Sequence, residues 1–368
     1  MPSRSSRPAV FVIAEIGTSH GGDLPRARSL VDAAAEAGAD CVKTQIVYAD
    51  EIVHPRTGLV DLPGGPVPLY ERFRSLEVKP EFFTEMAEHA RSRGLSFLAS
   101  VFGERSLDDL ASLGADTVKI ASPELNHAPL LHSVRDRGLK VILSTGVSML
   151  SDVERGLEAA GRQQATLLHC VTAYPAPEEE YNLRVIPNLA SVMGVPVGVS
   201  DHSIEPELVP AAATALGAPV IEKHLTLSRG DGGLDDPIAL TPKGFAAMVA
   251  AVRHAETRPA DETLAGLSDG YGDGRLEAVL GDGAKRLAAS ETPNYGRSNR
   301  SILATRDIAA GEPIGTHNAA ILRSEKNLEP GLSPFLWEEI LGVQAARPIL
   351  DGSGIRFGDL FDRAAAGS

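Results

Sequence analysis

The chain has 368 residues, 43% of them hydrophobic, which is enough for a large packed core. The formal net charge of −14 argues against a general nucleic-acid or membrane surface, because both require basic patches. The two cysteines, Cys41 and Cys170, cannot form a disulfide framework, and no CxxC pair offers a zinc site. We interpret Cys170 as a buried structural thiol. Since the N-terminus lacks the apolar segment of a signal peptide, we expect a cytoplasmic protein that binds neither nucleic acid nor membrane.

Short β-branched segments alternate with Ala- and Leu-rich amphipathic segments from residue 10 to about residue 255. This alternation is typical of βα units. The predicted strands are 10–17, 41–47, 95–101, 117–122, 140–146, 165–171, 195–202 and 219–227. Predicted helices include 23–38, 79–93, 104–113, 127–137, 150–162, 205–217 and 241–257. The short connections and the absence of a GxGxxG motif after the first strand favour an α/β fold of the TIM (β/α)8 barrel type over residues 1–257.

Three segments lie outside this pattern. Residues 48–78 form a long Pro- and Gly-containing stretch, which we interpret as a lid or binding loop, with a mobile surface insertion as the alternative. Residues 258–298 lack periodicity and are predicted to be a linker with a short helix at 274–289. Residues 299–368 are predicted to form a small β-rich domain, with strands at 301–314, 318–324 and 345–350 and a helix at 336–341.

Two histidines stand at the ends of neighbouring predicted strands, His202 after the seventh and His224 on the eighth. Barrel enzymes place their active sites at the carboxyl ends of the strands. Two neutral imidazoles there can share one divalent ion and leave coordination positions open. Because the site is rich in carboxylates, Mn²⁺ or Mg²⁺ is more plausible than zinc. The alternative is that each histidine makes structural hydrogen bonds.

Lysines and hydroxyls at the strand ends indicate an anion site. Lys43, Lys119, Ser122 and Ser144 offer ammonium and hydroxyl groups that can hold phosphate and carboxylate. Glu15, Glu124 and Asp235 are candidate acid, base or hydroxyl-binding groups. Two alternatives stay open: the lysines pair with Glu15, Glu124 or Glu222, or one of Lys43, Lys119 and Lys223 forms a Schiff base, as in a class I aldolase.

Motifs over most of the chain resemble those of the sialic acid synthase family. They are AEIGTSHGGD (14–23), VKTQ (42–45), KIASPE (119–124), ILSTG (142–146), LLHCVTAYPAP (167–177), NLR (182–184), GVSDHS (198–203) and IEKHLTL (221–227). The later sequence NRSILATRDIAAGEPI is similar to that family's antifreeze-like (SAF) domain, so the resemblance covers roughly residues 9–350. It implies a metal-dependent condensation of phosphoenolpyruvate with an N-acetylhexosamine or a related aldose.

The resemblance also implies a role for each matching position. The metal ligands would be His202 and His224. The phosphoenolpyruvate-binding residues would be Lys43, Lys119, Ser122, Ser144, Thr172 and Ser200. The groups around the acceptor sugar and the reacting centre would be Glu15, Gln45, Glu124, Tyr174 and Asp235. Arg300 would reach from the SAF domain into the barrel of a partner subunit, which implies a homodimer with exchanged C-terminal domains.

The sequence departs from the family pattern mainly around the expected acceptor. The departures are Ser19-His20-Gly21-Gly22 after the first strand, Thr44, Pro123, Gly103-Glu104 and the stretch 323–334. We therefore expect phosphoenolpyruvate chemistry with an acceptor other than N-acetylmannosamine, such as a diaminohexose precursor. A non-catalytic carbohydrate-binding module is the remaining alternative, and loss of metal binding would favour it.

Overall fold

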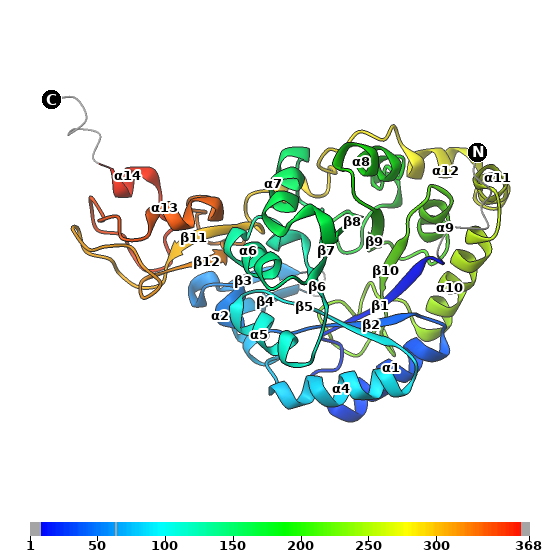
Figure 1. Ribbon diagram of the computed structural model, residues 1–368, viewed down its shortest axis with the longest axis horizontal. Coiled ribbons are helices and arrows are strands. Elements are labelled where there is room, and N and C mark those ends of the chain that lie inside the picture. Colours follow the sequence, from blue (N-terminus) through cyan, green and yellow to red (C-terminus); the bar gives the residue numbers. More distant parts are fainter. Residues whose placement is uncertain (1–8, 63–64, 362–368) are drawn as a thin grey trace.

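The computed structural model describes residues 9–62 and 65–361. Eight parallel strands close into a barrel in the order β1-β10-β9-β8-β7-β6-β5-β2 (Figure 1). These strands are β1 (Phe11–Gly17), β2 (Cys41–Gln45), β5 (Ser96–Ser100), β6 (Thr117–Ile120), β7 (Lys140–Ser144), β8 (Ala165–Cys170), β9 (Val197–Asp201) and β10 (Val220–His224). The predicted TIM barrel is confirmed, and each strand lies inside a segment that the sequence predicted.

Helices cover the outside of the barrel. They are α1 (Leu24–Glu36), α4 (Pro80–Ser92), α5 (Glu104–Ser112), α6 (Ala128–Asp136), α7 (Leu150–Ala160), α8 (Val185–Met193), α9 (Leu208–Ala215) and α10 (Pro242–Glu256). Side chains alternate between the two faces of each strand. In β1, Val12, Ala14 and Ile16 pack with the helices, whereas Ile13 belongs to a separate cluster inside the barrel.

The long connection after β2 is folded. It contains α2 (Ala49–Ile52), a 3-10 turn η2 (Pro55–Thr57), the hairpin β3 (Leu59–Leu62) and β4 (Gly65–Pro68), and α3 (Leu69–Arg74). Its apolar side chains, among them Ile52, Val60 and Phe73, form a small core with Phe102. This core joins the segment to the barrel.

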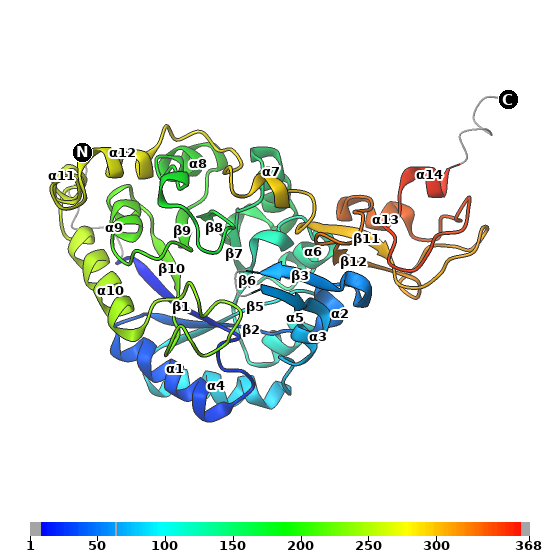
Figure 2. The ribbon, with the colours of Figure 1, turned by 180° about the vertical axis from the view of Figure 1, so that it is seen from behind.

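Residues 258–298 contain more helix than the sequence predicted. Helix α11 (Ala260–Tyr271) packs against α9, and α12 (Asp273–Leu280) packs against the 3-10 turn η5 (Glu178–Glu180). The helix predicted at 274–289 therefore ends early, at Leu280. Gly281 follows with a φ of 59°, a left-handed conformation that glycine adopts without steric cost. From there the chain runs past α8 and α7 to the C-terminal domain (Figure 2).

The C-terminal domain lies on one side of the barrel, beside α2, α6 and β3 (Figures 1 and 2). Its strands β11 (Arg300–Ala304) and β12 (Ala319–Arg323) pair antiparallel. They are followed by η7 (Pro334–Leu336), α13 (Trp337–Ile340) and α14 (Phe357–Leu360). The predicted strand at 345–350 contributes only an isolated bridge, between Ile308 and Ile349. Among the described helices, none has the length and apolar character needed to cross a membrane.

Candidate active site

A cavity of about 360 Å³ opens at the carboxyl ends of the barrel strands. Most residues predicted for the site line it: Glu15, Lys43, Gln45, Lys119, Ser122, Ser144, Thr172, Tyr174, Ser200, His202, His224 and Asp235. Glu124 and Arg300 do not. Other residues at the cavity were not predicted for the site, among them Ser100, Glu222, Asn294, Ser298, Arg323, Glu325 and Lys326.

The barrel interior changes from apolar to polar in one step along its axis. The inner apolar cluster consists of Ile13, Cys41, Leu98, Ile142, Leu168 and Val220. Two residues further along the same strands stand Glu15, Lys43, Ser100, Ser144, Cys170 and Glu222. Since residues two apart on a strand share a face, these side chains form the next layer inward of the barrel wall. The polar layer forms the floor of the cavity, and the apolar layer lies directly beneath it and closes the barrel below.

Two buried lysines and two buried carboxylates dominate this floor. Lys43 Nζ contacts the Glu15 carboxylate and donates to Ser100 Oγ at 3.1 Å. Lys119 Nζ donates to Ser144 Oγ at 2.7 Å, and Glu222 lies 3.6 Å from Lys43 and 3.9 Å from Lys119. Burial lowers the pKa of Lys119, and Lys43 lowers it further. Lys43 and Lys119 therefore form ion pairs with buried carboxylates and also line the cavity. Ion pairing with these carboxylates and binding of an anion in the cavity are thus compatible roles for the same two lysines.

Lys223 occupies a different environment. Its Nζ contacts the Asp201 carboxylate and donates to Ser203 Oγ at 3.1 Å and to the Glu205 carbonyl at 3.0 Å. It does not line the cavity. A Schiff base at Lys223 would form away from the site, which leaves Lys43 and Lys119 as the lysines that the aldolase alternative could use.

The two predicted metal ligands are adjacent. The ring centroids of His202 and His224 are 5.4 Å apart, and Tyr174 stacks on His202 at 4.4 Å. His202 Nδ1 lies 2.9 Å from the Val171 carbonyl. Because a carbonyl only accepts, Nδ1 carries a proton and Nε2 is the atom that can bind a metal. Asp235 lies 3.9 Å from His224 Nδ1.

These groups fit an open metal site. Burial lowers the pKa of His224 well below its usual value, so its ring is neutral, as a ligand must be. Burial also lowers the pKa of His202, but Cys170 and the Val171 carbonyl outweigh it and raise the pKa to about 9. A cation would therefore bind His202 with release of a proton, and its affinity should fall as the pH falls. Within residues 9–62 and 65–361, no three His, Cys, Asp or Glu side chains are grouped to hold an ion. Water or substrate would complete the coordination.

Glu124 and Arg300 form the junction between the barrel and the C-terminal domain. Glu124 Oε1 accepts from Arg300 Nε at 3.0 Å and from Arg323 at 2.9 and 2.6 Å. The remaining Arg300 donors face backbone carbonyls, including those of Phe102 and Ile321, both at 3.2 Å. Burial lowers the pKa of Arg300 to about 10. In this chain the Arg300 side chain is buried against the barrel and does not line the cavity, so its role at a partner's acceptor site stays a prediction.

Arg323 is the arginine of the C-terminal domain that reaches the cavity. Its side chain is partly exposed, lies over the Phe102 ring and lines the cavity with Glu325 and Lys326. Arg323 on β12 is paired directly with Arg300 on β11. The sequence predicted only Arg300 for the site, because the docking of this domain on the barrel decides which arginine faces the cavity.

Two of the sequence departures do not touch the cavity. Thr44 is buried and donates to the Gly17 carbonyl at 3.0 Å, and Ser19 donates to Asp236. Neither lines the cavity, whereas Pro123 does. Ser19 and Thr44 therefore support the shape of the loop after β1 and are not among the residues that line the cavity.

Comparison with known proteins agrees with this arrangement. The family model described as "NeuB family" matches residues 30–263, which is more than half of the chain. The chain belongs to the NeuB family. A SAF domain model matches residues 299–360, so the C-terminal domain of this NeuB protein is a SAF domain, as predicted.

Curated relatives cover nearly the whole chain. The spore coat polysaccharide biosynthesis protein SpsE of Bacillus subtilis is 38% identical over 95% of this chain and 93% of its own. The N,N'-diacetyllegionaminic acid synthase of Legionella pneumophila is 33% identical, covering 89% of both chains. The pseudaminic acid synthase of Campylobacter jejuni is 31% identical over 95% and 96%. The crystal structure of B. subtilis SpsE superposes with a TM-score of 0.81 and 36% identity, covering 97% of this chain and 96% of that one. The predicted family and the prediction of an acid synthase are confirmed.

Proposed function

We propose that this NeuB protein condenses phosphoenolpyruvate with an open-chain aldose to give a 2-keto-3-deoxy sugar acid and phosphate. One observation carries the proposal: two buried lysines and a set of hydroxyls share a cavity with two adjacent histidines. The lysines match a substrate with two anionic groups, and the histidines match a polarised carbonyl oxygen. Legionaminic and pseudaminic acid synthases among the relatives support the same reaction class.

The floor residues would bind phosphoenolpyruvate. Lys43 and Lys119 would offset the charge of its phosphate and carboxylate groups, and burial strengthens that attraction because water is excluded. Ser122, Ser144, Thr172 and Ser200 would add directional hydrogen bonds. The Ser200 hydroxyl donates to Glu222 Oε1 at 2.9 Å, so Glu222 keeps this hydroxyl and both lysines in one network.

His202 and His224 would hold a divalent cation, Mn²⁺ or Mg²⁺, through ring nitrogens that face the cavity. When bound, the cation would supply a Lewis acid for the aldehyde oxygen of the acceptor. The Val171 carbonyl fixes the tautomer of His202, and the Tyr174 hydroxyl lies 3.4 Å from its Nε2. Tyr174 would thereby help to orient the aldehyde.

The reaction forms a carbon–carbon bond and a carbon–oxygen bond to water, and it breaks the carbon–oxygen bond to phosphate. The methylene carbon of phosphoenolpyruvate attacks the aldehyde carbon, and the aldehyde oxygen takes up a proton to become a hydroxyl. Water adds to the resulting oxocarbenium carbon and loses a proton. The tetrahedral product then gives its hydroxyl proton to the departing phosphate, which takes the bridging oxygen and leaves the 2-keto group. Glu15 lies at the cavity floor beside Lys43 and would accept the proton of the attacking water. Asp235 and Gln45 line the cavity nearby and would bind acceptor hydroxyls.

The outer part of the cavity suits an acceptor with both apolar and polar substituents. Leu69, Phe73, Phe102 and Leu234 form an apolar wall, and Asp61, Arg323, Glu325 and Lys326 add charged groups. We propose a hexose that carries acetamido groups, with a diacetamido hexose preferred over N-acetylmannosamine. The charged groups would bind ring hydroxyls and amide oxygens, and the apolar wall would pack against methyl groups.

Phosphate release measures this function directly. The purified protein is incubated with phosphoenolpyruvate, Mn²⁺ or Mg²⁺, and a panel of aldoses, and the product is identified by mass spectrometry. We expect release that requires both sugar and metal and is fastest with a diacetamido hexose. Fastest turnover with N-acetylmannosamine would refute the acceptor assignment. Formation of the same product from pyruvate and sugar in the presence of a chelator, together with borohydride trapping of Lys43 or Lys119, would favour the Schiff-base aldolase instead.

The pH dependence of kcat/KM for phosphoenolpyruvate should reflect the ionisation of Glu15. Burial raises its pKa to about 7, Glu222 and Asp235 add to the increase, and Lys43 opposes it. A base must be ionised, so kcat/KM for phosphoenolpyruvate should fall as the pH drops below about 7. The Glu15→Gln variant should be slow at every pH and lose this limb. An unchanged acidic limb in Glu15→Gln would assign the titration to another group.

We also propose that the enzyme is a cytoplasmic homodimer, as the family resemblance implies. The Glu124 junction lies within one chain, so exchanged domains would form the same contacts between two copies. Light scattering tests the assembly: a mass of two chains is expected, and a monomer that is fully active would exclude a requirement for exchange.

A further inference from the structure

Glu291 is a buried carboxylate that joins the ends of two barrel strands. It belongs to the segment 281–299 between α12 and β11, which we name the strap. Its Oε1 accepts from the backbone N–H groups of Val147 and Thr172, both at 2.7 Å, and its Oε2 accepts from Ala288 N–H at 3.1 Å. The side chain is 1% exposed. Within the described residues no Lys, Arg or His side chain forms an ion pair with Glu291. Its Oε1 is instead hydrogen-bonded by backbone N–H groups of the loops after β7 and β8.

These loops form one wall of the anion site. Val147 follows Ser144 and Gly146 after β7, and Thr172 follows β8. Gly146 N–H donates to Ser122 Oγ at 3.0 Å, and a Cβ on Gly146 would lie 2.0 Å from Thr172 Oγ1. Ser122 and Thr172 are therefore both packed against Gly146, which stands two residues after Ser144, in backbone that Glu291 ties together.

Val147 shows that this backbone needs outside support. Its φ is 41°, in the left-handed region that a β-branched residue rarely adopts. The strap holds both of its peptide groups: Glu291 accepts from its N–H, and Asn299 Nδ2 donates to its carbonyl at 3.2 Å. Strained residues of this kind persist only where surrounding contacts fix them.

We propose that Glu291 is a positioning residue for the phosphoenolpyruvate-binding wall formed by Ser122, Ser144 and Thr172. It would act on the substrate only through the backbone of the β7 and β8 loops. This inference rests on the proposed function for its catalytic readout. It also makes the strap, which the sequence presented as a linker, part of the machinery that shapes the site.

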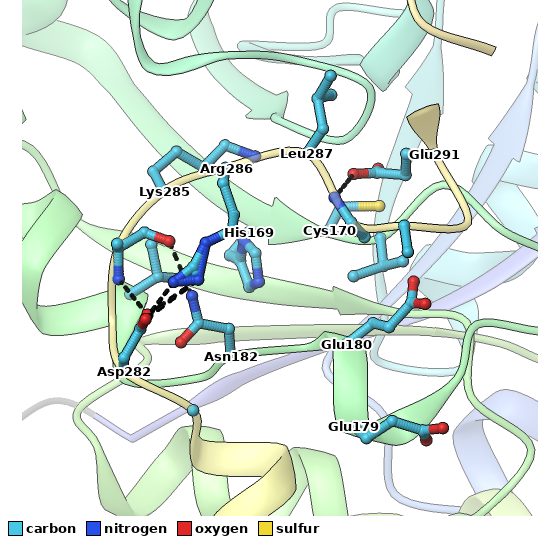
Figure 3. Close-up of a pocket in the computed structure, with 16 residues that line it drawn as sticks. His169, Cys170, Glu179, Glu180, Asn182, Asp282, Lys285, Arg286, Leu287 and Glu291 are labelled. Carbon is cyan, nitrogen blue, oxygen red and sulfur yellow. Dashed lines mark hydrogen bonds and ion pairs between the residues drawn. The ribbon is translucent and has the colours of Figure 1, made fainter. Parts of the chain in front are cut away.

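A second cavity, of about 300 Å³, allows a specific test. Figure 3 shows Glu291 and Cys170 at the same end of this cavity, with Lys285 and Asp282 toward the other end. Truncation of Glu291 to alanine would leave room for a small carboxylate, which could enter by this cavity and accept from the same N–H groups. Glu180 lines the same cavity and accepts from the N–H and the hydroxyl of Ser290, next to Glu291, but it touches neither strand end, so its removal serves as a control for loosening of the strap alone.

The experiment compares wild type with Glu291→Ala, Glu291→Gln and Glu180→Ala, each with added sodium acetate or with sodium chloride at equal ionic strength. In Glu291→Ala we expect kcat/KM for phosphoenolpyruvate to fall about 100-fold, mainly through KM, because small displacements of a site cost that much. The KM for the sugar should change little. Acetate should restore part of the loss, and Glu291→Gln, which keeps one acceptor oxygen, should lose less. Glu180→Ala, which removes contacts to Ser290 but keeps those of Glu291, should lose much less activity than Glu291→Ala and should not respond to acetate.

Hydrogen exchange provides a readout that is independent of the reaction. Peptides that contain Val147 and Thr172 should exchange faster in Glu291→Ala than in wild type, and acetate should restore protection. If wild type releases no phosphate, the proposed function fails, and the exchange data still test the role of Glu291. The inference is overturned if Glu291→Ala keeps wild-type kinetics and protection. It is also overturned if the variant loses activity that neither acetate nor Glu291→Gln recovers.

Discussion

Replacement of Lys119 by methionine should lower kcat/KM for phosphoenolpyruvate by about a thousandfold. Methionine keeps the apolar stem and removes the ammonium group that donates to Ser144 Oγ at 2.7 Å. The side chain is 2% exposed, so bulk solvent does little to compensate for the lost charge. Glu222 would also lose one of its two cationic neighbours, which makes the floor less favourable for an anion. Phosphate release at saturating sugar and metal measures the change.

Lys223→Met is the matched control for this variant. Lys223 is an equally buried lysine of the same barrel, but it contacts Asp201, Ser203 and the Glu205 carbonyl outside the cavity. We expect it to lower the melting temperature, because Asp201 is left buried without its partner, and to leave the KM for phosphoenolpyruvate near the wild-type value. If Lys119→Met binds and turns over phosphoenolpyruvate like wild type, the anion-site assignment is wrong.

Replacement of Arg300 by methionine should lower the free energy of unfolding by about 3–5 kcal/mol. The Arg300 and Glu124 side chains are both fully buried, and loss of one partner leaves several buried carbonyls without a donor. Urea denaturation followed by circular dichroism measures the loss. Under conditions where the variant is folded, its KM for the sugar should stay close to that of wild type.

Arg323→Met should show the opposite pattern. The Arg323 side chain is 13% exposed and lines the cavity, and Glu124 would keep Arg300 as a partner. We therefore expect a smaller loss of stability and an increase in the KM for the sugar. Stable Arg300→Met protein with impaired sugar binding would contradict the assignment of these two arginines.

Much of the barrel and of the polar cavity floor could be read from the sequence because both depend on strand period. Ile13 and Glu15, or Cys41 and Lys43, are two residues apart, so an apolar layer under a polar layer follows from the pattern of each strand. The same rule would have added Ser100 and Glu222 to the predicted site. Each stands two residues after a residue of the inner apolar cluster, Leu98 and Val220.

The rest of the site depends on structure that has no such period. Ser122 and Glu124 lie in the 3-10 turn η3 (Ser122–Glu124), which directs Ser122 into the cavity and Glu124 toward the SAF domain. A strand pattern cannot be continued through this turn. Likewise, α11 and α12 form in a Gly- and Asp-rich segment because they pack on the barrel, and this tertiary contact is invisible to local propensity. The side of β12 that faces the cavity is set by domain docking alone.

The junction at Glu124 also has a consequence for the order of events during biosynthesis. A ribosome releases the barrel strands first, yet Glu124 obtains its two arginine partners only from residues 300 and 323. Until those residues have emerged, the barrel carries a carboxylate without counter-charge and a cavity without the wall that contains Arg323. A nascent chain therefore presents an incomplete cavity until the SAF domain has emerged and docked on the barrel.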